Sequence, residues 1–188
     1  LPSGPDPVGE WNVRRQPPAV YVDHRAREFK RAAVPISARF RCCVKGNPQE
    51  PDVPSPLAPR LERDTLFAGD LILSRVLVMN DQRFPWAILV PRREGLTEIL
   101  DLAATERAIL MEEIASLAQA LRDLAEPEKL NVAALGNIVA QLHVHVVARY
   151  RHDPAWPGPV FGAGTAIPYE AEAGRAFVAR LAQKLGTA

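Results

Sequence analysis

Two histidines occupy alternate positions in an apolar run of the chain. Between Gln141 and Val147, His143 and His145 alternate with aliphatic residues. In a β-strand successive side chains point to opposite faces, so Gln141, His143 and His145 are expected to share one face at intervals of about 7 Å. An imidazole can act as a nucleophile or as a hydrogen-bond donor, and an amide can donate as well. The spacing therefore predicts a row of polar groups suited to following a phosphate chain.

Two other interpretations of these residues stay open. On an exposed sheet face, His143 and His145 would be no more than solvated polar side chains. A His-x-His pair can instead chelate zinc or another divalent ion where further ligands converge, and His152 is the histidine within reach. The only cysteines, Cys42 and Cys43, are adjacent and lack zinc-site spacing. We predict no metal site and no required cofactor, with metal binding as the minor alternative.

A long helix is expected to cover the sheet that holds the histidines. Apolar residues recur with helical period over residues 101–126, at Leu110, Ile114, Leu117, Leu121 and Leu124. Asp101 or Thr105 is the expected N-cap, and Pro127 prevents the helix from continuing. The apolar side of the histidine strand, opposite the imidazoles, is expected to pack beneath this helix.

The remaining segments indicate an α+β fold with an antiparallel β-sheet. Runs of aliphatic and β-branched residues bounded by turn residues predict four strands, and an amphipathic pattern predicts a C-terminal helix. The predicted order is strands over 71–79 and 86–90, the long helix, strands over 129–135 and 142–150, and a helix after Pro168. Short links between neighbouring strands favour antiparallel pairing over alternating strand-helix-strand units.

Length and composition limit the number of domains and the kinds of partner that we expect. A chain of 188 residues with 47% hydrophobic residues can bury one ordinary core, which we place over residues 57–188. Residues 1–56 hold 10 of the 18 prolines and are expected to form a disordered extension. A formal net charge of +1 gives no global attraction to nucleic acid or to a membrane. No apolar run reaches the roughly 18 residues of a membrane span and no secretory signal is visible, so a cytoplasmic protein is expected.

The run from Gly136 to Arg149 resembles the signature strand of the histidine-triad (HIT) superfamily, in which three histidines alternate with hydrophobic residues. The resemblance covers residues 57 to about 151, where the strands and the long helix follow the family's order. The stretch from Asp153 to Pro159 further resembles a bacterial branch of HIT-domain proteins. A HIT-like fold is what this resemblance implies.

The same resemblance implies nucleotide chemistry. In such proteins the middle histidine, which is His143 here, attacks the α-phosphorus of a nucleotide, expels the distal group and forms a covalent histidine-nucleotidyl intermediate. His145 then donates a hydrogen bond to the phosphate. The expected activity is that of a nucleotide hydrolase or nucleotidyltransferase acting on a phosphoanhydride, phosphoramidate or phosphoester bond.

Four further residues are expected at the substrate because of the resemblance. Asn137 stands where the family has a phosphate-contacting glutamine, and Asn131 lies where other members have a polar residue near the phosphates. Asn80 matches the position that contacts the ribose hydroxyls, and Trp86 is expected to close the base pocket. The alternatives are a turn-adjacent polar residue for Asn131, a hairpin-turn residue for Asn80, and an ordinary core residue for Trp86.

Two departures from the family leave a second function open. Gln141 replaces the first histidine and cannot transfer a proton, and Ile138 replaces a phosphate-contacting Ser or Thr. The alternative is therefore a nucleotide-binding module with little catalysis. The resemblance also implies a homodimer with a nucleotide or dinucleotide as ligand. Trp156 is a candidate for lining the partner's site, with packing on its own domain as the alternative.

Overall fold

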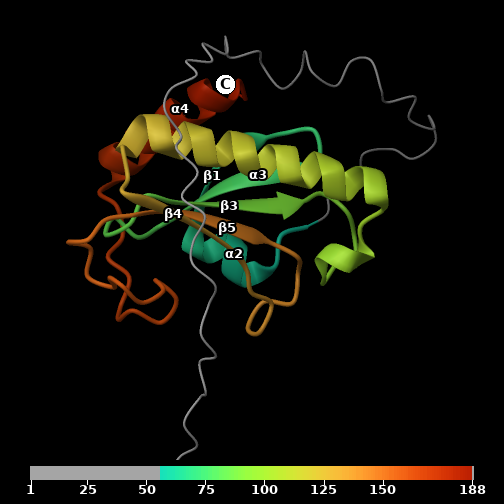
Figure 1. Ribbon diagram of the computed structural model, residues 1–188, viewed down its shortest axis with the longest axis horizontal. Coiled ribbons are helices and arrows are strands. Elements are labelled where there is room, and N and C mark those ends of the chain that lie inside the picture. The colour runs from blue at the N-terminus through green and yellow to red at the C-terminus, as the bar shows by residue number, and fades with distance from the viewer. Residues whose placement is uncertain (1–55, 188) are drawn as a thin grey trace, which may run out of the picture. The chain divides into compact units, whose positions relative to one another are not determined.

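The computed structural model describes residues 56–187. These residues form an α+β domain around a five-stranded antiparallel sheet in the order β1-β2-β3-β5-β4, which confirms the predicted fold class (Figure 1). In chain order the elements are α2 (Pro59–Asp64), β1 (Thr65–Asp70), β2 (Ser74–Met79), β3 (Trp86–Pro91), the 3-10 turn η1 (Ile99–Asp101), α3 (Ala104–Ala125), β4 (Lys129–Ala134), β5 (Val144–Arg149) and α4 (Ala171–Leu185). The extension predicted over residues 1–56 lies outside the described part of the chain except for Pro56.

The strand that carries the histidine run lies inside the sheet. β5 pairs with β3 on one side and with β4 on the other, both antiparallel. His145 is opposite Ile88 on β3 and Ala133 on β4. Two neighbours fix the backbone of this strand, so the direction of its side chains is set by the sheet rather than by a loop.

The sheet separates two hydrophobic layers. Figure 1 shows α3 and α4 on one side of the sheet and α2 on the other. The α3 side holds Val144 and Val146 of β5 together with Leu110, Leu117 and Leu121 of the helix, all buried. Full burial of one such leucine contributes about 1.5–3 kcal/mol. The predicted apolar side of the histidine strand thus packs beneath the long helix as expected.

The opposite side of the sheet is covered as well. A second cluster of buried residues there combines Leu61 of α2, Trp86 and Ile88 of β3, Val147 of β5, and Val160 of the segment after β5. Because His143 and His145 alternate with Val144 and Val146, their side chains lie on this second side.

The structure differs from the sequence-based prediction at several boundaries. The α2 helix and β1 strand precede the first predicted strand, and residues 71–73 form a turn in which Leu71 N donates to Ser74 O at 2.8 Å. The N-cap prediction is wrong because α3 follows Ala103, while the Asp101 carboxylate caps the preceding turn by accepting from Glu98 N at 2.8 Å.

Among the helices of the described residues, none combines the length and the apolar character that crossing a bilayer requires.

Candidate functional site

His143 and His145 lie together on the α2 side of the sheet. Their ring centroids are 4.7 Å apart at an interplanar angle of 80°, and each residue is only 5% exposed. His145 belongs to β5, whereas His143 directly precedes the strand. The two imidazoles therefore form one buried unit rather than two separate surface groups.

The hydrogen bond of His143 determines which ring nitrogen is available. Its Nδ1 lies 2.6 Å from the main-chain oxygen of Gln141. A carbonyl oxygen only accepts, so Nδ1 carries a proton and donates it. In the neutral ring Nε2 is then unprotonated and keeps its lone pair, which is the form a nucleophilic imidazole requires.

His145 is held in the opposite tautomer. The indole Nε1 of Trp86 lies 3.1 Å from Nδ1 of His145, and because an indole N–H only donates, this Nδ1 must accept. The proton of the neutral ring is therefore on Nε2. Burial, with a smaller contribution from the charge of His143, lowers the pKa of His145 from 6.5 to about 3. His145 is thus a neutral hydrogen-bond donor at physiological pH.

Aromatic rings enclose the histidine pair. The Phe161 ring packs edge-on against His145 with centroids 4.9 Å apart and against Trp86 at 5.4 Å. Trp86 itself is 7% exposed and lies in the second hydrophobic cluster. The alternative of solvated histidines on an exposed sheet face is therefore wrong, because α2 and the segment after β5 pack over this side.

The amide of Gln141 is bonded to the chain that leads into α2. Its Oε1 accepts from Ala58 N at 2.8 Å, and its Nε2 donates to the carbonyl oxygen of Pro56 at 3.1 Å. The side chain that the sequence predicts for the family's first histidine position is thus bonded to main-chain groups through both the oxygen and the nitrogen of its amide.

The three candidate asparagines are in different surroundings. Asn80 Oδ1 accepts from Tyr169 N at 2.9 Å, so this amide holds the chain that leads into α4. Asn131 Oδ1 accepts from Arg149 at 2.7 Å. Asn137 is exposed in the loop between β4 and β5, next to Ile138, which is 76% exposed. Of the predicted substrate-binding residues, Trp86 is the one with a contact to a histidine ring.

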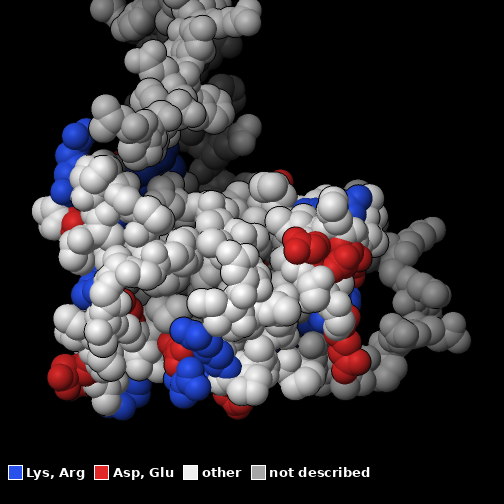
Figure 2. All heavy atoms as spheres, turned by 90° about the horizontal axis from the view of Figure 1, so that it is seen from below, with Lys and Arg blue, Asp and Glu red and all other residues white. Residues whose placement is uncertain are grey.

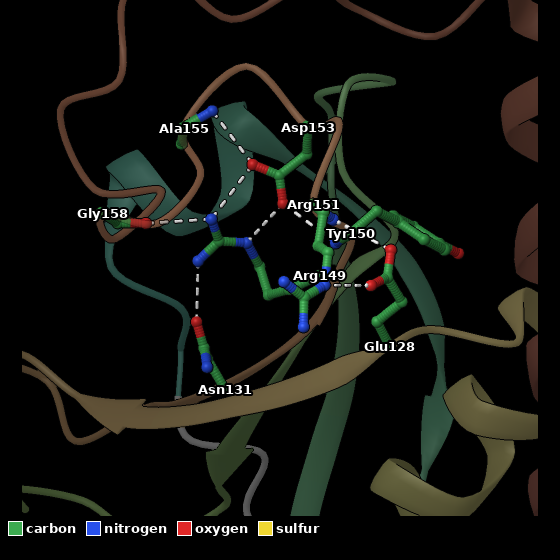
Figure 3. Close-up of polar contacts among 8 residues, drawn as sticks. All are labelled: Glu128, Asn131, Arg149, Tyr150, Arg151, Asp153, Ala155 and Gly158. Carbon is green, nitrogen blue, oxygen red and sulfur yellow. Dashed lines mark hydrogen bonds and ion pairs between the residues drawn. The ribbon is translucent and has the colours of Figure 1, made fainter.

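A buried ion pair lies farther along the same strand face. Arg149 Nε and Asp153 Oδ2 are 2.7 Å apart, with side chains 1% and 3% exposed. The guanidinium also donates to Asn131 Oδ1 at 2.7 Å and to the Gly158 carbonyl at 2.9 Å, as Figure 3 shows. The hydrogen bond from Arg149 holds the pKa of Asp153 down at about 2. These contacts fix the turn that leads toward Val160 and Phe161.

Sequence reasoning did not find this ion pair, although a signal for it exists. Arg149 continues the alternation of His143 and His145 at the end of an otherwise apolar strand, and Asp153 follows four residues later. A charged side chain on a face that is otherwise buried requires a partner.

Two cavities lie beside residues that flank the histidines in the chain. One, of about 410 Å³, is lined by β4 together with Val147, Val160 and Phe161. The other, of about 520 Å³, is lined by residues 56–58, residues 93–97 and Gln141. Neither cavity is lined by His143 or His145; the first reaches Val147 and the second reaches Gln141, the residues that flank the histidines in the chain.

Charge is sparse around this side of the molecule. Figure 2, seen from the α2 side, shows a large uncharged area with Lys, Arg, Asp and Glu in small separate groups. A phosphate at this site would be held by nearby hydrogen-bond donors rather than by a basic patch. No cluster of three His, Cys, Asp or Glu suited to a metal ion occurs within residues 56–187.

Comparisons with known proteins agree on one family. The HIT domain family model matches residues 60–152. A histidine triad protein from Bradyrhizobium japonicum is 45% identical with a TM-score of 0.68, and the match covers 70% of this chain and 98% of that one. For a histidine triad protein from Sinorhizobium meliloti the identity is 46%, the TM-score 0.68 and the coverage 70% and 97%. None of the curated proteins matches the chain.

A third structure gives the same result. A histidine triad protein from Marinobacter aquaeolei is 43% identical with a TM-score of 0.69, and the match covers 71% of this chain and 98% of that chain. Each of these three structures is matched over nearly its whole length, at 43–46% identity to this chain.

Proposed function

Because the chain belongs to the HIT domain family, we propose that it is a nucleotide hydrolase or nucleotidyltransferase with His143 as the nucleophile. The observation that carries this proposal is the hydrogen bond from His143 Nδ1 to the Gln141 carbonyl. It leaves Nε2 as the basic atom of a ring that cannot turn without losing this bond. Such an imidazole is ready to form a bond to phosphorus.

In the proposed reaction the Nε2 lone pair of His143 forms a bond to the α-phosphorus, and the bond from phosphorus to the leaving group breaks. The leaving group departs with the bonding electrons. Water or another acceptor then attacks the phosphorus and releases the His143 ring. His145, held by Trp86 with its proton on Nε2, donates to a phosphoryl oxygen as negative charge builds there.

The position of Gln141 favours one class of leaving group. An amide cannot deliver a proton, and this one is bonded to Ala58 and Pro56. Phosphoanhydrides expel a phosphate-type anion, which departs without being protonated. We therefore propose dinucleoside polyphosphates and related anhydrides as the preferred substrates, ahead of phosphoramidates and simple esters.

Turnover of a panel of nucleotides by the parent and by His143→Ala tests this proposal. The variant should lose at least about a hundredfold in kcat/KM, because the covalent route is removed. His152→Ala, which changes an exposed histidine outside the site, should keep parental turnover. Intact-mass analysis of a quenched reaction should show a nucleotidyl adduct on the parent only. Parental turnover by His143→Ala would exclude His143 as the nucleophile.

A second candidate is a nucleotide-binding module with little catalysis. It is favoured by the engaged amide of Gln141 and by Ile138 at a position where a hydroxyl donor is expected. Tight nucleotide binding by calorimetry, with no adduct and no turnover across the panel, would support it. In either case we propose that Asn137 donates to phosphate, and that the amide nitrogen of Asn80 faces the ribose.

We also propose that the protein is a homodimer. β4 is an edge strand of the described sheet, and its Val132 is 50% exposed. Leu135, just beyond the strand, is 37% exposed. An edge strand with exposed apolar residues can pair with a second chain. Trp156, which is 36% exposed and stacks against the Arg149 guanidinium that bonds Asn131 of this strand, is a candidate to contact the partner.

A further inference from the structure

The amide of Gln141 binds two main-chain groups that flank a single residue. Its oxygen accepts from Ala58 N at 2.8 Å, and its nitrogen donates to Pro56 O at 3.1 Å. In a parallel pair of strands, one residue bonds in this way to the carbonyl before and the N–H after its partner residue. The Gln141 side chain therefore makes the same two hydrogen bonds around Leu57 that a neighbouring parallel strand would make.

Few side chains can make this pair of bonds. A primary amide presents an acceptor and a donor side by side, at the spacing of adjacent main-chain groups. The two ring nitrogens of histidine point in diverging directions, so a histidine at position 141 cannot meet both groups at once. Asparagine has the same amide on a shorter arm.

The segment held in this way forms part of the cover over the histidine pair. Leu57 and Ala58 pack against the cluster of buried residues that includes Leu61 and Val147, on the side of the sheet that carries the histidine rings. Proline at the first helical position begins α2 directly after Ala58. The two bonds from Gln141 thus fix where this helix starts.

The main chain of the same residue holds His143. The Gln141 carbonyl accepts from His143 Nδ1 at 2.6 Å, while the Gln141 side chain is fixed at both ends. Because the amide is bonded through both its oxygen and its nitrogen, the side chain restricts rotation of the Gln141 backbone. One residue therefore links the start of α2 to the orientation of the nucleophile.

We infer that Gln141 is a positioning residue whose amide clamps residues 56–58 over the site and thereby holds the carbonyl that sets the His143 tautomer. In this role its amide neither binds phosphate nor moves a proton. The catalytic consequence rests on the proposed function, whereas the clamp itself does not.

Gln141→Ala tests the clamp in the full-length chain, with Gln119→Ala as the matched control. Gln119 donates to Asp123 at 2.7 Å on the exposed side of α3, so its loss also removes one glutamine hydrogen bond. In Gln141→Ala, hydrogen exchange at the Ala58 amide should quicken about tenfold, the effect of losing one hydrogen bond. Nitrogen-15 NMR should show a mixture of both tautomers at His143, with His145 unchanged.

Two further variants keep the test informative if the alanine variant folds poorly. Gln141→Glu retains the acceptor for Ala58 N but loses the donor to Pro56 O, so its Ala58 exchange should lie between parent and alanine variant. Gln141→His should exchange like the alanine variant. With substrate, kcat of Gln141→Ala should fall about tenfold while KM stays within about twofold.

The outcomes separate the clamp from the reaction. Parental Ala58 exchange together with a single His143 tautomer in Gln141→Ala would overturn the clamp, whatever the activity. If Gln141→His turned over substrate faster than the parent and kept parental Ala58 exchange, the clamp would also be overturned. Position 141 would then be a catalytic position at which glutamine lacks the functional group. If His143→Ala kept its turnover, the proposed nucleophile would be wrong, yet the exchange measurements would still decide the clamp.

Discussion

At the scale of residues, different partners hold the two imidazoles in opposite tautomers. His143 donates from Nδ1 to a carbonyl two residues away, and His145 accepts at Nδ1 from Trp86, 59 residues away in the chain. The alternation in the sequence correctly places both rings on one side of the strand. The tautomer of His145 was not predictable, because its partner Trp86 belongs to another strand and leaves no mark in the local pattern.

Replacing Trp86 with phenylalanine tests how much the indole N–H contributes. An aromatic ring remains in the cluster, but the donor to His145 Nδ1 is lost. We expect His145 to sample both tautomers, kcat to fall about tenfold and the free energy of unfolding to drop by about 0.5–1.5 kcal/mol. Nitrogen-15 NMR and steady-state kinetics measure the two effects. An unchanged His145 tautomer would show that Trp86 only packs.

The low pKa of His145 predicts a pH dependence of stability. The unfolded histidine binds a proton near pH 6.5, whereas the folded one does so only near pH 3. Between these values the unfolded state binds more protons, so the free energy of unfolding should fall as pH decreases, by at most about 1.4 kcal/mol per unit.

Urea unfolding of the parent and of His145→Gln between pH 6.5 and 5 isolates this contribution. Glutamine can still accept from Trp86 but does not titrate. The parent should lose more stability than the variant over this window. The exposed His152→Gln serves as the control and should follow the parent. Equal slopes for parent and His145→Gln would contradict the assignment.

At the scale of elements, long periodic segments were predictable and short ones were not. The helix over 101–126 and the four strands were found because their apolar residues repeat over several turns or alternations. The β1 strand was missed because Gly69 adopts a positive φ of 128° where its pairing with β2 is irregular. The α2 helix has only six residues, which is too few to show a period.

Asp153→Ala tests the anchor of the segment after β5. The change leaves the Arg149 guanidinium buried without its carboxylate, which should cost about 3–5 kcal/mol of unfolding free energy in a urea titration. Because this segment brings Phe161 onto His145, the aromatic cover should loosen as well. Asp123→Ala, which removes a carboxylate 42% exposed in its pair with Lys184, should cost less than about 1 kcal/mol. Equal losses would mean that the buried pair does not anchor the turn.

At the scale of the whole molecule, both outer strands of the described sheet expose an apolar side chain, Phe67 on β1 at 58% and Val132 on β4 at 50%. β1 and β4 are the two outer strands of the sheet in residues 56–187, and β4 exposes Val132 beside a cavity of about 410 Å³. A single sequence indicates which residues are apolar but not which strand lies at an edge, since that depends on the pairing of β3 with β5. The proposed dimer could therefore be assigned to β4 only after the strand order was known.

Val132→Lys tests whether β4 is the dimer surface. A lysine on an edge strand opposes pairing with a second chain, because its charge would have to be buried. Light scattering after size exclusion should give a dimer for the parent and a monomer for the variant at the same concentration. Ile72→Lys is the control, since Ile72 is 43% exposed in the turn between β1 and β2. It should stay dimeric, and a parent that is monomeric at every concentration would remove the dimer from the proposal.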